Sequence, residues 1–403
     1  MTTHRALAPK PVAQRRFRLL LVLAGLSGAA PLATDMYVPG LPDLAASLGT
    51  DTSGAQMSLT GFLVGIIVGQ LILGPLSDAV GRRPVLLTGT TGFTALSAVC
   101  ALAPTIAVLD VARFGQGVSG AAGIVVARAV VADLFDDHDI AAMYSRLGAI
   151  TAAAPVLAPM AGGALLLILP WRGVFAVLAA FGLILVVGVW RWIPESHPPQ
   201  ARLSGGITGG LRAIAALATR RAVMAPVLAL SFGGAAVFAY IAGTTFVFQD
   251  IYHLTPATAS LVYGSNAIGN MLGSLTYGRL VKHRPPQTLL VASAAVAATG
   301  SALLFLASAT IGSPMALTWV CLLLSLTAFG VFFPAVVTIA QQRGRTAPGA
   351  TSALLGSGQF LLGAAASPIV GLFGTHTPAP MAAVMTVALT LATLAALTTA
   401  RRP

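Results

Sequence analysis

The sequence has very little charge, and little of that charge is acidic. Only 8% of its 403 residues are Asp, Glu, Lys or Arg, and Asp and Glu together number 11. Soluble globular domains carry charged residues at roughly a quarter of their positions, whereas 56% of this chain is hydrophobic. The composition therefore excludes a soluble globular protein and predicts an integral membrane protein.

Two kinds of site are also missing from the sequence, and their absence limits the functions that it can have. The two cysteines, Cys100 and Cys321, lie far apart in apolar runs, so we expect neither a disulfide framework nor a metal site. The sequence has no glycine-rich phosphate loop with a lysine, so ATP-driven pumping has no support, and we expect no cofactor. The acids of segment 133–139 could hold a cation, but nothing nearby suggests a substrate site, and we do not expect an enzyme.

The chain does contain about twelve apolar runs long enough to cross a membrane, which takes about 20 residues. The first begins near Phe17 and contains Pro31, Pro39 and Pro42, so it should be bent with an irregular outer end. The others are predicted at 57–73, 85–103, 105–132, 141–169, 173–193, 222–248, 257–280, 288–309, 314–340, 349–373 and 380–400. The fold class predicted is an all-α membrane protein with 12 transmembrane helices.

The net charge of +12 could suggest a nucleic-acid partner, but its distribution does not. Of the 23 Lys and Arg residues, all except Arg113 and Arg172 lie at those ends of the runs that share one side of the membrane. This asymmetry follows the positive-inside rule. It predicts that both termini are cytosolic, that the number of spans is even, and that nucleic acid is not a partner.

Segment 74–87, GPLSDAVGRRPVLL, is a polar break between two apolar runs. Its glycine and proline are expected to end one helix in a short cytosolic turn, and Asp78 is placed to meet the positive N-terminus of a helix. Arg82 and Arg83 are expected to anchor the turn at an anionic membrane surface. The alternative is an ordinary basic loop between two spans. Segment 273–290 is a weaker repeat that has lost the acid.

This segment resembles the signature loop of the major facilitator superfamily of secondary transporters. The matching residues are Gly74, Leu76, Asp78, Gly81, Arg82, Arg83 and Leu86. The resemblance implies the major facilitator fold, in which two six-helix halves surround a site near the membrane midplane. The halves would be residues 1–194 and 222–403, joined by a cytosolic linker at 195–221 with a surface helix.

Ionisable residues inside spans are costly and mark functional sites by default. Asp35, Asp110 and Arg113 are such residues, and no acid lies within a span of the second half. If the bent first helix continues to about Leu44, Asp35 and Arg113 both lie roughly 13 Å deep and could meet. The alternatives are an interfacial cap for Asp35 and a structural pair of Arg113 with Asp110, one turn away.

Burial favours a protonated carboxyl and a nearby arginine favours an ionised one, so Asp35 could exchange a proton in a cavity that opens to either side. Arg113, Gln116, Gly117 and Ala121 resemble the superfamily motif R-x-x-Q-G-x-x-x-A, whose arginine is implicated in proton coupling. The segment TDMYVPGLP, 34–42, resembles the first span of the Bcr/CflA (chloramphenicol and bicyclomycin resistance) group of drug:proton antiporters. That resemblance implies that Asp35 binds protons and cationic substrates.

The fifth span is rich in proline and glycine, which permit bending and close helix contact. Pro159, Gly162 and Gly163, with Gly148 and Pro155 upstream, resemble the antiporter signature of the superfamily. Ala158 stands where the general signature has glycine, as in the Bcr/CflA group. The alternative is a plain kinked span.

Candidate substrate contacts are predicted mainly from helix periodicity. Tyr263, Asn266 and Asn270 recur at i, i+3 and i+7 and share one face of the eighth span. Tyr37, Tyr240, Phe246 and Gln359 could add aromatic and amide contacts. Interhelical hydrogen bonds and aromatic belts at the membrane interface would explain the same residues equally well.

The sequence thus predicts a proton-driven multidrug, phenicol or bicyclomycin-type efflux antiporter in a bacterial cytoplasmic membrane, acting as a monomer by alternating access. In this mechanism Asp35 binds a proton or substrate and Arg113 couples that choice to conformation. The alternative is a carrier of the same fold for an endogenous metabolite or nutrient, either an exporter or a proton symporter.

Overall fold

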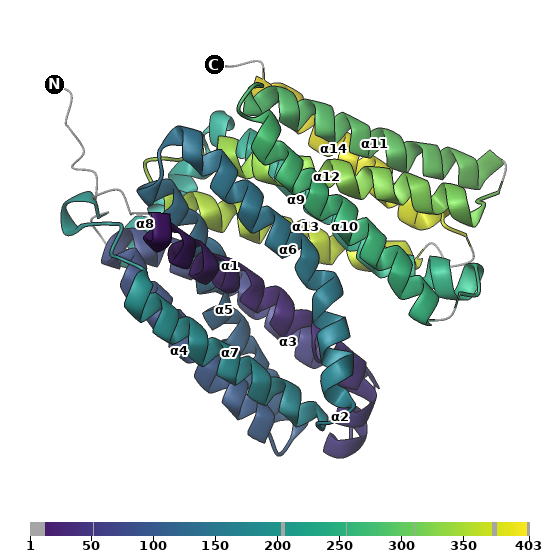
Figure 1. The fold of residues 1–403 in the computed structure, drawn as a ribbon, viewed down its shortest axis with the longest axis horizontal. Coiled ribbons are helices and arrows are strands. Elements are labelled where there is room, and N and C mark those ends of the chain that lie inside the picture. The colour runs from purple at the N-terminus through teal and green to yellow at the C-terminus, as the bar shows by residue number, and fades with distance from the viewer. Residues whose placement is uncertain are drawn as a thin grey trace. The chain divides into compact units, whose positions relative to one another are not determined.

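A computed structural model describes residues 13–50, 52–202, 206–254, 256–310, 312–372 and 377–400, and every element within these ranges is helical (Figure 1). The chain divides into two units. The first comprises Met1–Met143, Ala158–Ile214 and Arg345–Ala353, and the second comprises Tyr144–Leu157, Ala215–Gly344 and Leu354–Pro403. Helices α6 and α13 each contribute residues to both units. The predicted boundaries at 194 and 222 remain a prediction.

The helices up to the linker follow the apolar runs of the sequence. They are α1 (Ala13–Asp35), the 3₁₀ turn η1 (Val38–Gly40), α2 (Leu41–Leu48), α3 (Thr52–Val80), α4 (Arg82–Leu102), α5 (Ile106–Leu134), α6 (Asp137–Leu166) and α7 (Trp171–Trp192). The end of the first span is irregular, as expected, because α1 gives way to η1 and α2 near Pro39. The linker contains a 3₁₀ turn, η2 (Pro199–Ala201), and a helix, α8 (Gly206–Ala218).

The later helices lie within a few residues of the predicted spans. They are α9 (Arg221–Thr245), the π-helical η3 (Phe246–Ile251), α10 (Pro256–Leu280), α11 (Pro286–Thr310), α12 (Met315–Arg343), α13 (Pro348–Leu372) and α14 (Ala379–Ala400). The irregular η3 continues α9, which contains Pro226, for about one and a half turns.

The packing of the helices repeats between the two units. In the first, α5 packs on α3, α4 and α1, and α7 packs on α4 and α1. In the second, α12 packs on α10, α11 and α9, and α14 packs on α11 and α9. The same set of neighbours in the same chain order shows an internal structural repeat, for which the sequence holds only the weak match between segments 74–87 and 273–290.

Nine helices in the described residues are long and apolar enough to cross a membrane. They are α1, α3, α4, α5, α7, α9, α11, α12 and α14 with their short extensions. Helices α6, α10 and α13 have 30, 25 and 25 residues, a sufficient length for a 30 Å hydrocarbon layer. The count of twelve spans and the cytosolic location of the termini remain predictions.

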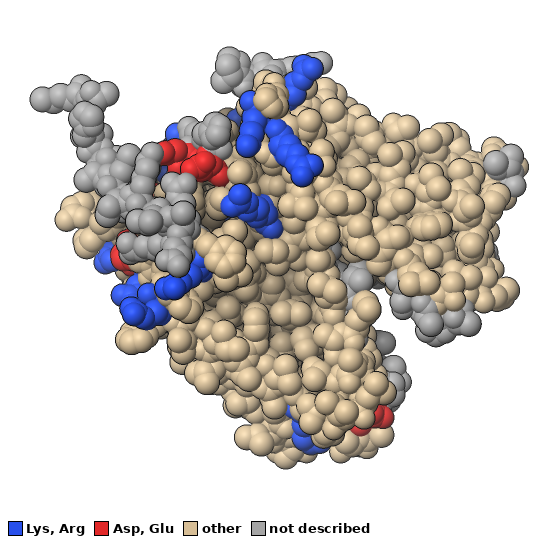
Figure 2. Space-filling model, viewed as in Figure 1, with Lys and Arg blue, Asp and Glu red and all other residues tan. Residues whose placement is uncertain are grey.

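The outer surface of the helices is strongly apolar. On α7, the exposed side chains include Leu183, Ile184, Val187 and Trp190. Figure 2 shows that Lys, Arg, Asp and Glu are sparse on the visible face, with wide areas that carry none. A surface of this kind would be costly in water and is suited to lipid.

The expectation that Gly74 and Pro75 end a helix is wrong. Both lie inside α3, which continues to Val80, and the chain breaks only at Gly81. Pro75 removes one backbone donor, a loss that membrane helices tolerate, and it packs against Gly210 of α8. Gly74 lies against the backbone carbonyl of Gly349. Tertiary contacts therefore keep this stretch helical against its local propensity.

Gly81 is the point at which the chain turns from α3 into α4. Its φ of 109° and ψ of 158° belong to a region that only glycine adopts readily. A Cβ atom at this position would also lie 2.5 Å from Oε2 of Glu195 and 2.8 Å from Nη2 of Arg202. The glycine thus permits both the turn and the close approach of the linker.

We expect Gly81→Ala to destabilise the protein by about 1–3 kcal/mol, the cost of a strained backbone residue, with a further cost because backbone amides hold Glu195 in place. The measurement is the midpoint of thermal unfolding in detergent. Gly49→Ala is the control, because Gly49 also has positive φ, 64°, but has open space where the Cβ would stand. An equal loss in both variants would contradict the role of the Glu195 contact.

Candidate functional site

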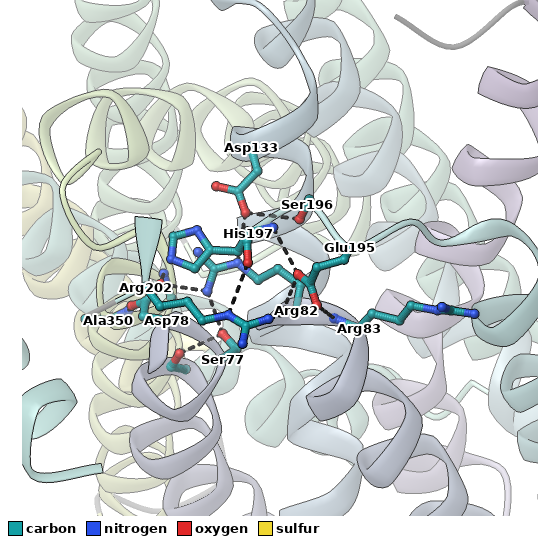
Figure 3. A network of polar contacts seen from close by, with 12 residues as sticks. Ser77, Asp78, Arg82, Arg83, Asp133, Glu195, Ser196, His197, Arg202 and Ala350 are labelled. Atoms are coloured by element: carbon teal, nitrogen blue, oxygen red, sulfur yellow. Dashed lines mark hydrogen bonds and ion pairs between the residues drawn. The ribbon is translucent and has the colours of Figure 1, made fainter. Parts of the chain in front are cut away.

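Arg82 is the centre of a buried polar network at the junction of α3 and α4 (Figure 3). The side chain is 0% exposed. Its Nη1 lies 2.6 Å from Oδ1 of Asp78 and its Nε lies 2.9 Å from Oδ2 of Asp133, and Nη1 also donates to Oγ of Ser77. The expectation that Arg82 anchors the turn at a membrane surface is therefore wrong, since two carboxylates bind it inside the protein.

Asp78 lies at a helix N-terminus, as its position after an apolar run suggested. Its Oδ1 accepts a hydrogen bond from the backbone N–H of Gly349 at 3.0 Å, and its Oδ2 accepts one from Ala350 at 2.9 Å. Both amides belong to the first turn of α13, in the segment that forms part of the first unit. The carboxylate therefore satisfies two unpaired donors and meets the positive end of the helix dipole.

Glu195 binds the N-terminus of α4 as Asp78 binds that of α13. Its carboxylate accepts hydrogen bonds from the backbone N–H groups of Arg82, at 2.9 Å, and Arg83, at 3.3 Å. It also accepts one from the backbone N–H of His197. The adjacent Ser196 hydroxyl donates to Asp133. The start of the linker is thus hydrogen-bonded to the turn between α3 and α4, which lies more than a hundred residues earlier in the chain.

Asp133 and Glu195 are the acidic members of this network whose roles the sequence did not reveal. The sequence places both in polar segments between predicted spans. The scarcity of acids is the signal that could have indicated them. Because the chain contains only 11 acids, an acid that lies beside a span, on the same side as Arg82 and Arg83, is a strong candidate for an ion pair with one of these arginines. Arg83 is half-buried and donates instead to the carbonyl of Trp190, at 2.6 Å.

His197 lies beside this network, in the linker beyond the end of α7. The side chain is 5% exposed, and its Nε2 has no hydrogen-bond partner among the described residues. Burial and the positive charge of Arg82 lower the pKa of the imidazole, against the attraction of Asp133, Asp78 and Glu195. The folded protein therefore holds His197 neutral.

This has a consequence for stability at acid pH. A histidine whose pKa is lowered by folding takes up protons more readily when unfolded, so its stabilising contribution is complete above a pH of about 6.5 and is lost on acidification below it. We expect His197→Gln to reduce the fall in thermal midpoint between about pH 7.5 and 5.5. The control is His283→Gln, at an exposed histidine in the turn after α10. A fall as large as in the wild type would refute the prediction.

Arg113 forms a second buried centre, on α5. Its side chain is 0% exposed, and Nη1 donates to the backbone carbonyl of Ala33 at 3.0 Å and to Oε1 of Gln116 at 2.7 Å. Ala33 is in the last turn of α1, where carbonyls lack helical partners. Arg113 therefore caps the negative end of the α1 dipole with a positive charge.

Aromatic rings enclose this guanidinium. Its Cζ atom lies 4.1 Å from the ring centre of Phe62 and 4.4 Å from that of Tyr37, and Phe175 is at 5.6 Å. Such cation–π contacts stabilise a desolvated cation without neutralising it. Nε and Nη2 have no hydrogen-bond partner among the described residues. The site thus holds a buried cation with unused donors, and nothing in the sequence indicated Phe62 or Phe175.

Asp35 is the last residue of α1, next to the carbonyls that Arg113 caps. The residue is half-buried, and its carboxyl group interacts electrostatically with Arg113. The described contacts include no ion pair between the two and none between Arg113 and Asp110, whose Oδ1 is buried without a partner among the described residues. Asp35 and Arg113 are therefore close enough to influence each other.

Gly162 of the antiporter-like segment packs directly on this site. A Cβ atom on Gly162 would stand 1.8 Å from the backbone oxygen of Met36, the residue after Asp35. Gly117 allows a similar approach of α5 to the carbonyl of Phe62. The side chains of Pro155 and Pro159 lie outside the described residues. The structure therefore links this motif to the Asp35 segment through one glycine.

We expect Gly162→Ala to displace the end of α1 and to destabilise the protein by about 1–3 kcal/mol, the usual cost of overpacking. Gly163→Ala is a matched control, because no atom lies within 4 Å of a Cβ at Gly163. Thermal unfolding of both variants in the same detergent tests the difference. If Gly163→Ala lowers the midpoint as much as Gly162→Ala, the contact with Met36 is not the cause.

The predicted substrate contacts lie in different surroundings. Tyr37 is 1% exposed, and its hydroxyl lies 3.1 Å from Oγ of Ser58. Asn266 donates from Nδ2 to the hydroxyl of Tyr240 at 3.1 Å. Asn270 faces Gly330 of α12, and the methylenes and backbone of Gln359 pack on Gly234 of α9; the side chain of Phe246 lies outside the described residues. Among the described residues, no group of His, Cys, Asp and Glu is arranged to hold a metal ion.

A profile of the Major Facilitator Superfamily matches residues 23–368. The chain belongs to this superfamily. It is thus a multi-pass membrane transporter and not an enzyme, and the resemblance noted in its motifs is confirmed.

Its relatives in the superfamily include bacterial transporters. The chain is 36% identical to Uncharacterized MFS-type transporter YdgK of Bacillus subtilis, over 96% of each chain. It is 28% identical to Bicyclomycin resistance protein homolog of Haemophilus influenzae, over 94% of this chain and 95% of the relative. It is 30% identical to Multidrug transporter MdfA of Edwardsiella ictaluri, over 78% and 76%.

Solved structures of the superfamily share the fold. The proton:xylose symporter XylE matches with a TM-score of 0.78 over 96% of each chain, at 16% sequence identity. The transporter FucP, in an outward conformation, matches with a TM-score of 0.75 over 95% of this chain and 98% of that one, at 15% identity. At these identities the likeness shows the fold alone.

Proposed function

We propose that the protein is a proton-coupled exporter of drug-like small molecules, working by alternating access, with Asp35 as the exchangeable proton and substrate site. The observation that carries the proposal is the position of Asp35, a half-buried residue at the end of α1, next to the buried and incompletely bonded guanidinium of Arg113. Buried ionisable groups in a membrane protein mark ion and substrate pathways.

Two opposing influences act on Asp35. The negative end of the α1 dipole disfavours an ionised carboxylate, and the positive charge of Arg113 favours it. Ionisation of Asp35 therefore depends on where Arg113 lies, and any movement of α5 against α1 changes the affinity of the carboxyl for a proton. A cationic or polar substrate that contacts the carboxylate competes with the proton for the same group.

Arg113 supplies the link to conformation. Its Nη1 is bonded to α1, while Nε and Nη2 have no partner among the described residues. A buried donor without a partner costs free energy, so a second arrangement in which these atoms gain an acceptor is favoured when one is offered. Because proton and substrate have different affinities for the two arrangements, each shifts the equilibrium between them.

The other motifs fit roles in the same cycle. We assign the Asp78–Arg82 network to stabilising one conformation, since Asp78 must leave the first turn of α13 for that helix end to move. Gly162 lets α6 move against α1 without a side chain between them. Support for export of drugs comes from the relatives, two of which are named for bicyclomycin resistance and multidrug transport.

The test is drug export by an efflux-deficient bacterial host that expresses the wild type, Asp35→Asn or Asp43→Asn. Susceptibility is measured to phenicols, bicyclomycin, lipophilic cations and quinolones, and proton-driven uptake is measured in inverted membrane vesicles. We expect Asp35→Asn to abolish export, because an amide cannot exchange a proton. Asp43→Asn, the control at an exposed acid on α2, should export as the wild type does.

Full export by a well-expressed Asp35→Asn protein would overturn the assignment of Asp35. A wild type that is present in the membrane and protects against none of the compounds would instead indicate a carrier for an endogenous metabolite or nutrient. Uptake assays with labelled metabolites would then follow.

A further inference from the structure

The second unit contains a buried polar cluster without charge, formed by Tyr240 of α9 and by Asn266 and Tyr263 of α10. Nδ2 of Asn266 donates to the Tyr240 hydroxyl at 3.1 Å, and Tyr240 and Tyr263 are close enough to interact electrostatically. Asn266 is 1% exposed, whereas both tyrosines are half-buried.

Two polar atoms of this cluster lack a hydrogen-bond partner among the described residues. They are Oδ1 of Asn266 and the hydroxyl of Tyr263, and both are buried. Exchanging the amide oxygen and nitrogen of Asn266 would not resolve this, because the nitrogen would then be unpaired. A buried polar group without a partner costs about 1–3 kcal/mol, and a bound molecule that supplies the missing bonds recovers that cost.

The surroundings indicate what kind of group would bind. The ring of Tyr263 packs edge-on against Phe248 at 6.5 Å, within an apolar core that includes Val262 and Ala259. From residue 222 onward the sequence contains a single acid, Asp250, which follows the seventh predicted span. The cluster therefore has no negative charge with which to attract a cation, and its available chemistry is neutral hydrogen bonding.

We propose that Tyr240, Asn266 and Tyr263 form a subsite that hydrogen-bonds an uncharged hydroxyl or amide group of the transported molecule. This inference rests on the proposed export function and deepens it. Hydroxyl and amide groups both donate and accept, so they satisfy Asn266 in either orientation of its amide. The subsite distinguishes substrates that carry such groups from lipophilic cations that do not, and it takes no part in proton exchange at Asp35.

Asn270, on the same face of α10, does not belong to the subsite. Its Oδ1 would lie 2.9 Å from a Cβ on Gly330, and its backbone oxygen 2.0 Å from it. This residue is engaged in the close packing of α10 on α12. The periodicity of the sequence thus grouped Asn270, which packs between helices, with Tyr263 and Asn266, which have unpaired polar atoms.

The experiment compares two probes in inverted vesicles that contain the full chain. Chloramphenicol carries hydroxyl groups and an amide, and tetraphenylphosphonium is a cation without either. We expect Tyr263→Phe and Asn266→Leu each to raise the KM for chloramphenicol about five- to tenfold, the effect of one lost hydrogen bond. The KM for tetraphenylphosphonium should change less than about twofold.

Tyr252→Phe is the matched control. Tyr252 also packs on Phe248, at 5.6 Å, but its hydroxyl is already bonded to the carbonyl of Ser313 and to Thr318. Its removal should leave the ratio of the two KM values unchanged. If Asn266→Leu does not reach the membrane, Tyr263→Phe still decides the question, since it deletes one oxygen atom from a half-buried ring.

The outcomes separate this inference from the proposed function. Equal effects of Tyr263→Phe on both probes, or no effect on either, would overturn the subsite. A wild type that exports tetraphenylphosphonium but not chloramphenicol would leave the proposed function intact and would also overturn the subsite. A wild type that exports neither probe would remove the proposed function and this inference with it.

Discussion

The first unit depends on the pairing of one buried cation. Arg82 has no exposed surface, and an unpaired charge there would cost several kcal/mol. Its carboxylate partners come from α3 and α5, and these partners have further bonds of their own. Asp78 binds the first turn of α13, and Asp133 accepts from Ser196 in the linker. One charge therefore ties together four helices and a connecting segment. The chain turns from α3 to α4 at Gly81, which leaves room for Glu195.

The two buried arginines differ in how completely they are satisfied. Arg82 is neutralised by two carboxylates, and that arrangement favours a single structure. Arg113 is held by a carbonyl, an amide oxygen and three aromatic rings, none of which carries a negative charge. Its charge is stabilised but not cancelled, and it acts on Asp35 at the end of the neighbouring helix. In the proposed function, the first arginine holds a conformation and the second responds to a proton or a substrate.

The internal repeat preserves packing but not charge. Helices α3 and α10 pack on α5 and α12 in the same way, yet Tyr277 stands four residues after Gly273 where Asp78 stands four residues after Gly74. The Tyr277 hydroxyl, fully buried, donates to Thr338 of α12 at 3.1 Å. A neutral hydrogen bond thus replaces the ion pair. Among the described residues, the fully buried Asp and Arg side chains, which are Asp78, Arg82 and Arg113, lie in the first unit, and the fully buried polar side chains of the second unit carry hydroxyl and amide groups.

Hydropathy, positive charge and proline are properties of short segments, so the amino-acid sequence alone predicts the membrane class, the positions of the long helices and the residues of the motifs. Helix α10, for example, was predicted at 257–280 and begins one residue earlier. The partners of these residues come from contacts between distant segments of the folded chain. Asp78 binds amides 271 and 272 residues further along the chain, Glu195 caps a helix that began more than a hundred residues before it, and Phe62 covers Arg113. Tertiary contacts also keep α3 helical through Gly74 and Pro75. Such contacts depend on how distant helices pack, and no local pattern of residues encodes that packing.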